Sequence, residues 1–187
     1  MSEAKNIILV GFMGSGKSVV GRVLARLTGS SMVDADAELV RKAGRPISQI
    51  FQEDGEPAFR ELERSVIRDL CSQSGKVIAA GGGSFVDQDN RNLMLANGQV
   101  VCLSARPETI LQRISRSQGN EKQVGNAPVR PLLAGDDPLR RIKELLAQRA
   151  ESYAQADYTV ETDELTPEQV ADKVLELCRA AEKVPEI

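Results

Sequence analysis

The chain has 187 residues, of which 41% are hydrophobic and 27% charged, and its formal net charge is −3. This length fits a single domain with a sizeable core, and the mild charge excludes a polybasic nucleic-acid-binding protein. No apolar stretch reaches the length of a membrane span, and residues 1–5 are too few and too polar for a secretory signal, so we expect a cytoplasmic protein that contacts neither nucleic acid nor membrane.

The residue types that are missing also restrict the chemistry. Histidine is absent, which excludes histidine general bases, Ser-His triads and histidine metal sites. The three cysteines (Cys71, Cys102 and Cys178) are widely spaced in apolar segments, so we predict reduced, buried thiols. Acid–base and charge chemistry must therefore use Asp, Glu, Lys and Arg.

Strands and helices are predicted to alternate along the whole chain. The expected strands span residues 7–10, 31–34, 76–80, 99–103 and 158–161. The expected helices span about 17–27, 37–42, 47–53, 57–73, 88–96, 107–116, 138–153 and 167–182, and a polar loop covers 117–136. Five such strands imply a parallel sheet with helices on both faces, whose ligands bind beyond the carboxyl ends of the strands.

The first strand leads into a phosphate-binding loop. Gly11-Phe12-Met13-Gly14-Ser15-Gly16-Lys17-Ser18 has the spacing G-x-x-x-x-G-K-[ST]. Backbone N–H groups of such a loop, and the positive end of the helix that follows, bind phosphate oxygens. Lys17 is expected to reach the β- and γ-phosphates, and the Ser18 hydroxyl to ligate Mg²⁺. The predicted ATP-binding residues here are Gly14, Ser15, Gly16, Lys17, Ser18 and Val19.

Two further features fall at the carboxyl ends of strands. Asp34 and Asp36 share a parity in a predicted extended segment, so both side chains could face one side. They could simply be solvated carboxylates of a turn, or Asp34 could hold Mg²⁺ through a water while Asp36 orients an attacking hydroxyl. The triplet of residues 81–83 is all glycine, which favours a place where backbone closely approaches a ligand over a plain loop.

Three arginines have two interpretations each. Arg60 and Glu63 are at i,i+3 on a predicted helix, and a surface ion pair is the favoured interpretation of this pair alone. Arg60 could instead grip an anionic substrate bidentately. Arg130 in the polar loop and Arg149 on the next helix would individually be solvated side chains, but an arginine on a closing lid can neutralise transition-state charge.

Taken together, these motifs in this order resemble the shikimate kinase family, within the nucleoside-monophosphate-kinase-like branch of phosphate-loop enzymes. The motifs are the phosphate loop, Asp34-Ala35-Asp36, Phe59-Arg60-Glu61-Leu62-Glu63, the glycine triplet, Arg130-Pro131-Leu132-Leu133, and Arg149 four residues before Tyr153. The sequence departs from the family in having Ala35 where members often have Thr, and in a longer stretch at 117–129.

The resemblance implies an α/β fold with a five-stranded parallel sheet in the order 2-3-1-4-5. It also implies one kinase domain over 1–187, with a helical insertion at about 36–62 that binds substrate and a lid at about 117–136. The implied reaction is ATP-dependent phosphorylation of the 3-hydroxyl of shikimate by a monomer with Mg²⁺.

The resemblance assigns roles residue by residue. Lys17, Asp36 and Arg130 would be catalytic, with Arg130 reaching the transferring phosphate, and Ser18 and Asp34 would hold the metal. Arg113 and Pro167 would sandwich the adenine. The implied substrate-binding residues are Asp36, Arg60, Glu63, Arg149, Gly81, Gly82, Gly83, Phe51 and Phe59.

Other functions remain open at this point. A sister kinase acting on another hydroxy acid, such as a gluconate kinase, would also use paired arginines, although the Phe-Arg-x-x-Glu and Gly-Gly-Gly motifs favour shikimate. A GTPase switch would carry an Asn-Lys-x-Asp motif, and the sequence has none. A silent homologue would have lost Lys17, Asp36 or the lid arginine, and all three are present.

Overall fold

The computed structural model describes residues 5–121 and 137–182. The strands are Asn6–Val10 (β1), Ser31–Asp34 (β2), Lys76–Ala79 (β3), Gly98–Ser104 (β4) and Tyr158–Glu161 (β5). The helices are Lys17–Thr28 (α1), Ala35–Ala43 (α2), Ile47–Glu53 (α3), Gly55–Cys71 (α4), Gln88–Asn97 (α5), Pro107–Glu121 (α6), Pro138–Tyr153 (α7) and Pro167–Glu182 (α8). Every predicted strand and helix is present.

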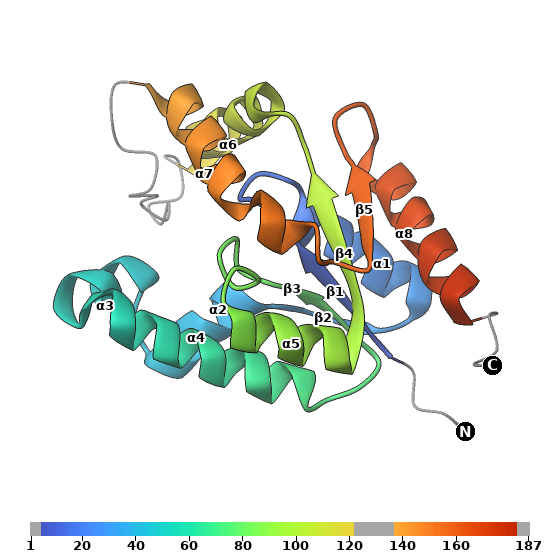
Figure 1. Cartoon of the computed structure of the whole chain (residues 1–187), viewed down its shortest axis with the longest axis horizontal. Helices are drawn as coiled ribbons and strands as arrows, with labels where there is room; N and C mark the ends of the chain where they lie inside the picture. Colours follow the sequence, from blue (N-terminus) through green and yellow to red (C-terminus); the bar gives the residue numbers. More distant parts are fainter. Residues whose placement is uncertain (1–4, 122–136, 183–187) are drawn as a thin grey trace.

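The strands form one parallel sheet in the order β2-β3-β1-β4-β5, which confirms the predicted fold class. Side chains alternate along the central strand β1, so Ile8 and Val10 join one core cluster and Leu9 joins the other. Helices α1 and α8 cover the Leu9 face, and α4 and α5 cover the opposite face (Figure 1). The short apolar strands are therefore buried on both faces, as parallel strands require.

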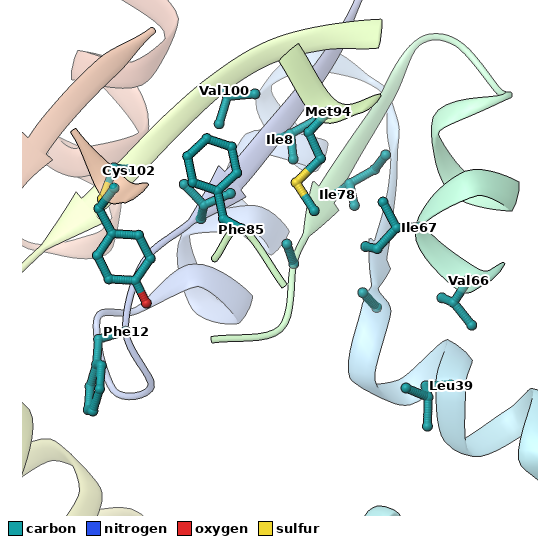
Figure 2. Packing of buried hydrophobic residues seen from close by; sticks show 14 of the residues in the cluster. Ile8, Phe12, Leu39, Val66, Ile67, Ile78, Phe85, Met94, Val100 and Cys102 are labelled. Atoms are coloured by element: carbon teal, nitrogen blue, oxygen red, sulfur yellow. The ribbon is translucent and has the colours of Figure 1, made fainter. Parts of the chain in front are cut away.

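The core on the α4 and α5 face also anchors the turn that follows β3. Figure 2 shows Phe85 packed among Ile8, Val100 and Met94, and none of these four side chains is exposed. Phe85 comes two residues after the glycine triplet. A fully buried aromatic ring at this point fixes the end of the glycine turn to the sheet.

The structure corrects the predicted boundaries of two helices, α4 and α6. Helix α4 begins at Gly55, two residues before the predicted start, and ends at Cys71 rather than at residue 73. Helix α6 continues to Glu121, so the predicted loop at 117–136 is wrong for its first five residues. The Ser117 hydroxyl bonds back to the carbonyl of Ile114, and a single glycine such as Gly119 weakens a helix by only about 1 kcal/mol without breaking it.

Cys71, Cys102 and Cys178 are buried thiols that form no disulfide, as predicted. Burial raises the pKa of the Cys71 and Cys102 thiols to about 11, so neither is a reactive thiolate at neutral pH.

Among the described residues, no helix has the length and apolar character needed to cross a membrane. Helices α2, α3 and α4, which include the predicted insertion at 36–62, pack against one another (Figure 1).

Candidate active site

The phosphate loop joins β1 to α1 and depends on glycine. Gly11, Gly14 and Gly16 have φ angles of 129°, 77° and 105°, a backbone region that strongly favours glycine. A Cβ built at Gly11 would lie only 2.3 Å from the carbonyl oxygen of Leu103, so no larger residue fits there. The loop runs directly into α1, which begins at Lys17. This is the strand–loop–helix arrangement that the sequence motif predicts.

Lys17 is buried within this loop. Its ammonium group donates to the carbonyl oxygens of Gly11 and Phe12 at 2.8 and 2.9 Å. Burial lowers the pKa of Lys17 to about 8, and the carboxylates of Asp36 and Asp34 oppose that shift. A cation with so little hydration gains strongly from a nearby anion, because the local dielectric is low. The electrostatics of Lys17 therefore favour phosphate binding.

Asp34 caps α2, and this overturns one prediction. One of its carboxylate oxygens accepts from the N–H groups of Asp36 and Ala37 at 3.1 and 3.3 Å, and the other accepts from the Ser18 hydroxyl at 2.7 Å. Asp34 itself is extended, as predicted, but the helix begins at Ala35, so the expected extended conformation is wrong for residues 35 and 36. Capping by Asp34 and acidic side chains in the first turn both stabilise a helix start here.

The Ser18 and Asp34 oxygens beside the loop fit a magnesium site. No group of three or more acidic or cysteine side chains that could hold a metal occurs within residues 5–121 and 137–182. Mg²⁺ does not need such a cage, because it keeps several waters and binds through one or two protein oxygens plus substrate phosphates. The oxygen pair, next to a phosphate loop, satisfies this requirement.

Asp36 faces the glycine turn from the first turn of α2. A Cβ built at Gly81 would lie 2.7 Å from its Oδ1. The residue meets the solvent of the cleft, yet protein on several sides limits hydration of its carboxylate. This desolvation raises the pKa of Asp36 to about 6; Asp34 and Glu63 add to the rise, and Lys17 opposes it. At neutral pH Asp36 is therefore ionised but more basic than an ordinary aspartate, which suits a hydrogen-bond and proton acceptor.

The glycine triplet lies close to groups from three parts of the site. A Cβ at Gly82 would lie 3.3 Å from the backbone nitrogen of Met13, in the phosphate loop. A Cβ at Gly83 would lie 3.2 Å from Nη1 of Arg60. With Gly81 against the Asp36 carboxylate, each glycine is the position of closest approach to a different neighbour. Protein neighbours therefore leave little room for side chains at this turn, and its close approach to a ligand stays a prediction.

Arg60 is held by a buried carboxylate. Its Nη1 donates to Glu63 Oε2 at 2.8 Å, and the Ser84 hydroxyl donates to Glu63 Oε1 at 2.7 Å. Glu63 is only 5% exposed, so the favoured interpretation as a surface pair is wrong. The exposed partner of Arg60 is Glu56, at 3.2 Å. Burial acts to lower the pKa of Arg60, but the hydrogen bond and charge of Glu63 raise it overall.

Two phenylalanines form an apolar wall beside this cation. The ring centroids of Phe51 and Phe59 are 4.5 Å apart, and Arg60 Cζ lies 5.2 Å from the Phe59 centroid. Phe59 is buried, whereas Phe51 is 37% exposed and lines the cleft. An aromatic wall next to a guanidinium group suits a small anion that also has an apolar ring face.

Arg149 reaches the same turn from α7. Its Nη1 donates to the carbonyl oxygen of Gly82 at 2.9 Å, and the Tyr153 hydroxyl donates to that same oxygen at 2.6 Å. The guanidinium carbon also lies 5.2 Å from the centroid of the Phe12 ring, a cation–π contact with the phosphate loop. Arg60 and Arg149 therefore contact neighbouring glycines of one turn.

Arg113 ties α6 to the phosphate loop and to the segment after β5. It donates to Thr162 Oγ1 and to the Thr162 carbonyl at 2.9 and 2.7 Å, with longer contacts of 3.5 and 3.4 Å to the carbonyls of Gly14 and Ser15. Pro167 at the start of α8 lines the same cleft. The place of Arg113 and Pro167 against an adenine ring stays a prediction.

One cleft of about 1770 Å³ unites these features. It exceeds the roughly 300–1,000 Å³ of a typical single-ligand pocket, so it has room for a nucleotide and a second substrate. Arg130 lies outside the described residues, as does most of the predicted lid. All other predicted site residues line the cleft: Gly14, Ser15, Gly16, Lys17, Ser18, Val19, Asp34, Asp36, Phe51, Phe59, Arg60, Glu63, Gly81, Gly82, Gly83, Arg113, Arg149 and Pro167.

Sequence reasoning assigned no role to three polar residues of this site: Ser84, Tyr153 and Thr162. Tyr153 carried a usable signal, because it follows Arg149 by four residues on one helix and so shares its face. Ser84 and Thr162 carried none, since each is positioned by contacts with residues far away in the chain.

The comparisons with known proteins agree with this geometry. A sequence model of the family described as "Shikimate kinase" matches residues 13–179. A shikimate kinase of Thermodesulfovibrio yellowstonii is 39% identical over 171 residues, which is 91% of this chain and 93% of that protein.

Solved structures show the same relationship. The shikimate kinase of Acinetobacter baumannii, solved in complex with shikimate, has a TM-score of 0.86 at 37% identity and covers 97% of this chain and 96% of its own. A gluconokinase of Sinorhizobium meliloti has a TM-score of 0.61 at 18% identity, with coverages of 97% and 96%, and so shares the fold alone. The chain therefore belongs to the shikimate kinase family, in agreement with its phosphate loop and with the two arginines at its glycine turn.

Proposed function

We propose that this protein transfers the γ-phosphoryl group of ATP to the 3-hydroxyl of shikimate, giving shikimate 3-phosphate and ADP. The observation that carries the proposal is the continuity of one cleft. Its phosphate loop adjoins a turn that Asp36, Arg60 and Arg149 all approach. A donor site for phosphates and an acceptor site for a hydroxylated anion thus share one wall. Membership of the shikimate kinase family supports the choice of acceptor.

On the donor side, the backbone of the phosphate loop would bind the β- and γ-phosphates. Lys17 would exchange its contacts with the Gly11 and Phe12 carbonyls for phosphate oxygens, a favourable exchange for a buried cation. Ser18 and Asp34 would hold Mg²⁺, which when bound neutralises phosphate charge. Arg113 and Pro167 would flank the adenine.

On the acceptor side, Arg60 and Arg149 would bind the substrate carboxylate through charge-assisted hydrogen bonds. Glu63 would fix the direction of Arg60, because its carboxylate is itself held by Ser84. Ring hydroxyls would bond to Asp36 and to the backbone at Gly82, between walls formed by Phe51 and Phe59. The proposed acceptor-side residues are Asp36, Phe51, Phe59, Arg60, Glu63, Gly81, Gly82, Gly83 and Arg149.

Asp36 would accept the hydrogen bond of the attacking hydroxyl and take its proton as the new P–O bond forms. The transition state of phosphoryl transfer is loose, so alignment of the hydroxyl contributes more than deep deprotonation. Lys17 would stabilise the charge on the transferring group, and Arg130 would do so from the lid. Water must be excluded during transfer, because it would otherwise hydrolyse ATP.

We also propose that the protein acts as a monomer in the cytoplasm. Its three buried cysteines form no disulfide, which is typical of a reducing compartment. Of the exposed large apolar residues in the described part of the chain, Val19, Val40 and Phe51 line the cleft itself, and so they need no protein partner to explain them.

A coupled assay of ADP release tests the proposal. With saturating MgATP, the protein is offered shikimate, quinate, gluconate and buffer alone, and the product is identified by ³¹P NMR. We expect turnover with shikimate that greatly exceeds the others and phosphorylation at the 3-position. Turnover with gluconate but not shikimate would instead support a sister hydroxy-acid kinase. Absence of turnover with every acceptor would refute the proposed activity.

A further inference from the structure

One backbone carbonyl receives two side-chain donors from α7. Arg149 and Tyr153 are one helical turn apart, so their side chains lie on the same face. Both donate to the carbonyl oxygen of Gly82, the guanidinium at 2.9 Å and the phenol at 2.6 Å. A carbonyl oxygen has two lone pairs, and both are used here.

This carbonyl lies where three parts of the site meet. Gly82 touches the phosphate loop, since a Cβ there would lie 3.3 Å from the Met13 nitrogen. Arg149 contacts the same loop through the Phe12 ring. A shift of the Gly82 peptide would therefore alter both the acceptor turn and its contact with the donor loop. Such a junction needs a constant hydrogen-bond partner, because a half-buried carbonyl that loses its partners is only partly compensated by solvent.

The two donors differ in how freely they can move. Arg149 is half-buried on the cleft wall, whereas the Tyr153 ring is 9% exposed and belongs to the core cluster that contains Phe12 and Phe85. Burial raises the pKa of Tyr153, and the charge of Arg149 only partly opposes the rise, so the phenol stays protonated and remains a donor. The tyrosine is the fixed donor and the arginine is the one that can turn.

We propose that Tyr153 is a positioning residue whose hydroxyl holds the Gly82 carbonyl, so that Arg149 can turn to the substrate carboxylate without releasing the acceptor turn. The inference rests on the proposed function, because it assigns Arg149 to a carboxylate. It goes beyond that function in giving a task to a residue that touches neither substrate nor reacting atoms.

The alternative is that Tyr153 is only a core ring. Tyr153→Phe separates the two roles, since it keeps the ring and removes only the hydroxyl. Tyr158→Phe is the matched control: it is the only other tyrosine, it lies on β5, and it packs against the opposite core cluster. Both variants are compared with the unchanged protein in thermal unfolding and in steady-state kinetics.

We expect Tyr153→Phe to raise the KM for shikimate about three- to tenfold, the effect of losing one hydrogen bond between neutral groups. The KM for ATP should stay within about twofold, because the loop backbone keeps its own contacts. Tyr158→Phe should leave both values unchanged. Equal KM values for shikimate in the two variants and the unchanged protein would overturn the inference while leaving the proposed function intact. Absence of shikimate turnover in the unchanged protein would overturn both.

A second measurement leaves Tyr153 in place. In Tyr158→Phe protein labelled with [ζ-¹³C]tyrosine, a single resonance reports Tyr153, because the chain has two tyrosines. On addition of shikimate and ADP we expect this resonance to shift as the Arg149 charge moves away, but to stay in the range of a hydrogen-bonded phenol. A Tyr153 resonance that moves to the position of an unbonded phenol would show that the tyrosine releases Gly82, contrary to the proposal.

Discussion

Replacing Glu63 by glutamine tests how a buried carboxylate positions Arg60. The substitution keeps the size and shape of the side chain, removes its charge and replaces one acceptor oxygen by an NH₂ group. In the structure both carboxylate oxygens are used, one by Arg60 at 2.8 Å and the other by Ser84 at 2.7 Å. A glutamine offers one acceptor oxygen and an NH₂ group, so one of these two donors must lose its acceptor.

The size of the effect follows from burial. A hydrogen bond to a charged partner contributes about 1.5–3 kcal/mol. Glu63 is nearly buried, but the Arg60 side chain is 30% exposed, so solvent screens part of the interaction. We therefore expect a loss of about 1–2 kcal/mol in the free energy of unfolding. For a domain of this length that corresponds to a fall in Tm of about 3–6 °C.

The kinetic effect should be confined to the acceptor. Without its buried partner, the guanidinium of Arg60 keeps only the exposed Glu56 and is oriented less well toward a carboxylate. We expect the KM for shikimate to rise about tenfold and the KM for ATP to stay within about twofold, measured in the coupled ADP-release assay. Glu56→Gln is the matched control, because it removes the other carboxylate that contacts the same arginine, at 65% exposure.

Equal changes in the two variants would refute this reasoning. If Glu56→Gln raised the KM for shikimate as much as Glu63→Gln, the orientation of Arg60 would not depend on the buried carboxylate. A rise in the KM for ATP of the same size would show that the change spreads to the phosphate loop and is not specific to the acceptor.

Three other predictions concern the catalytic part of the cleft. Asp36→Asn should lower kcat about 100-fold or more, while the affinity for MgATP measured by calorimetry stays unchanged. The variant should also have a higher Tm at neutral pH, because the raised pKa of Asp36 means that its charge opposes folding above about pH 6. This gain in Tm should vanish below the ordinary pKa of 3.8, where Asp36 is protonated in both the folded and the unfolded chain. The pH profile of kcat/KM should rise through about 6 as Asp36 ionises and fall above about 8 as Lys17 loses its proton, and Asp36→Asn should lose the acidic limb. Gly81→Ala should reduce kcat and lower Tm, since its Cβ would lie 2.7 Å from Asp36 Oδ1 and 2.8 Å from Ser84 Oγ. If kcat in the coupled assay and Tm in thermal unfolding both stayed unchanged, the turn would be able to move aside.

Much of the fold could be predicted because its signals are local. The apolar runs at β1 and β4, the period of the helices and the fixed spacing of the phosphate loop all lie within short stretches of chain. The strand order came from the resemblance to the shikimate kinase family and not from any local pattern. The end of α6 was misjudged because polar residues and one glycine look like a loop, although a helix tolerates them.

The sequence by itself determined the phosphate-binding part of the donor side, because the loop, its lysine and its serine belong to one stretch of chain. The acceptor side was decided by tertiary structure. Only folding shows that Glu63 is buried against Ser84, that Asp36 belongs to a helix, and that Arg149 and Tyr153 share the Gly82 carbonyl. The physical reason is that burial and hydrogen-bond partners at this turn come from β3, α2, α4 and α7, which are far apart in the chain and meet only when the sheet forms.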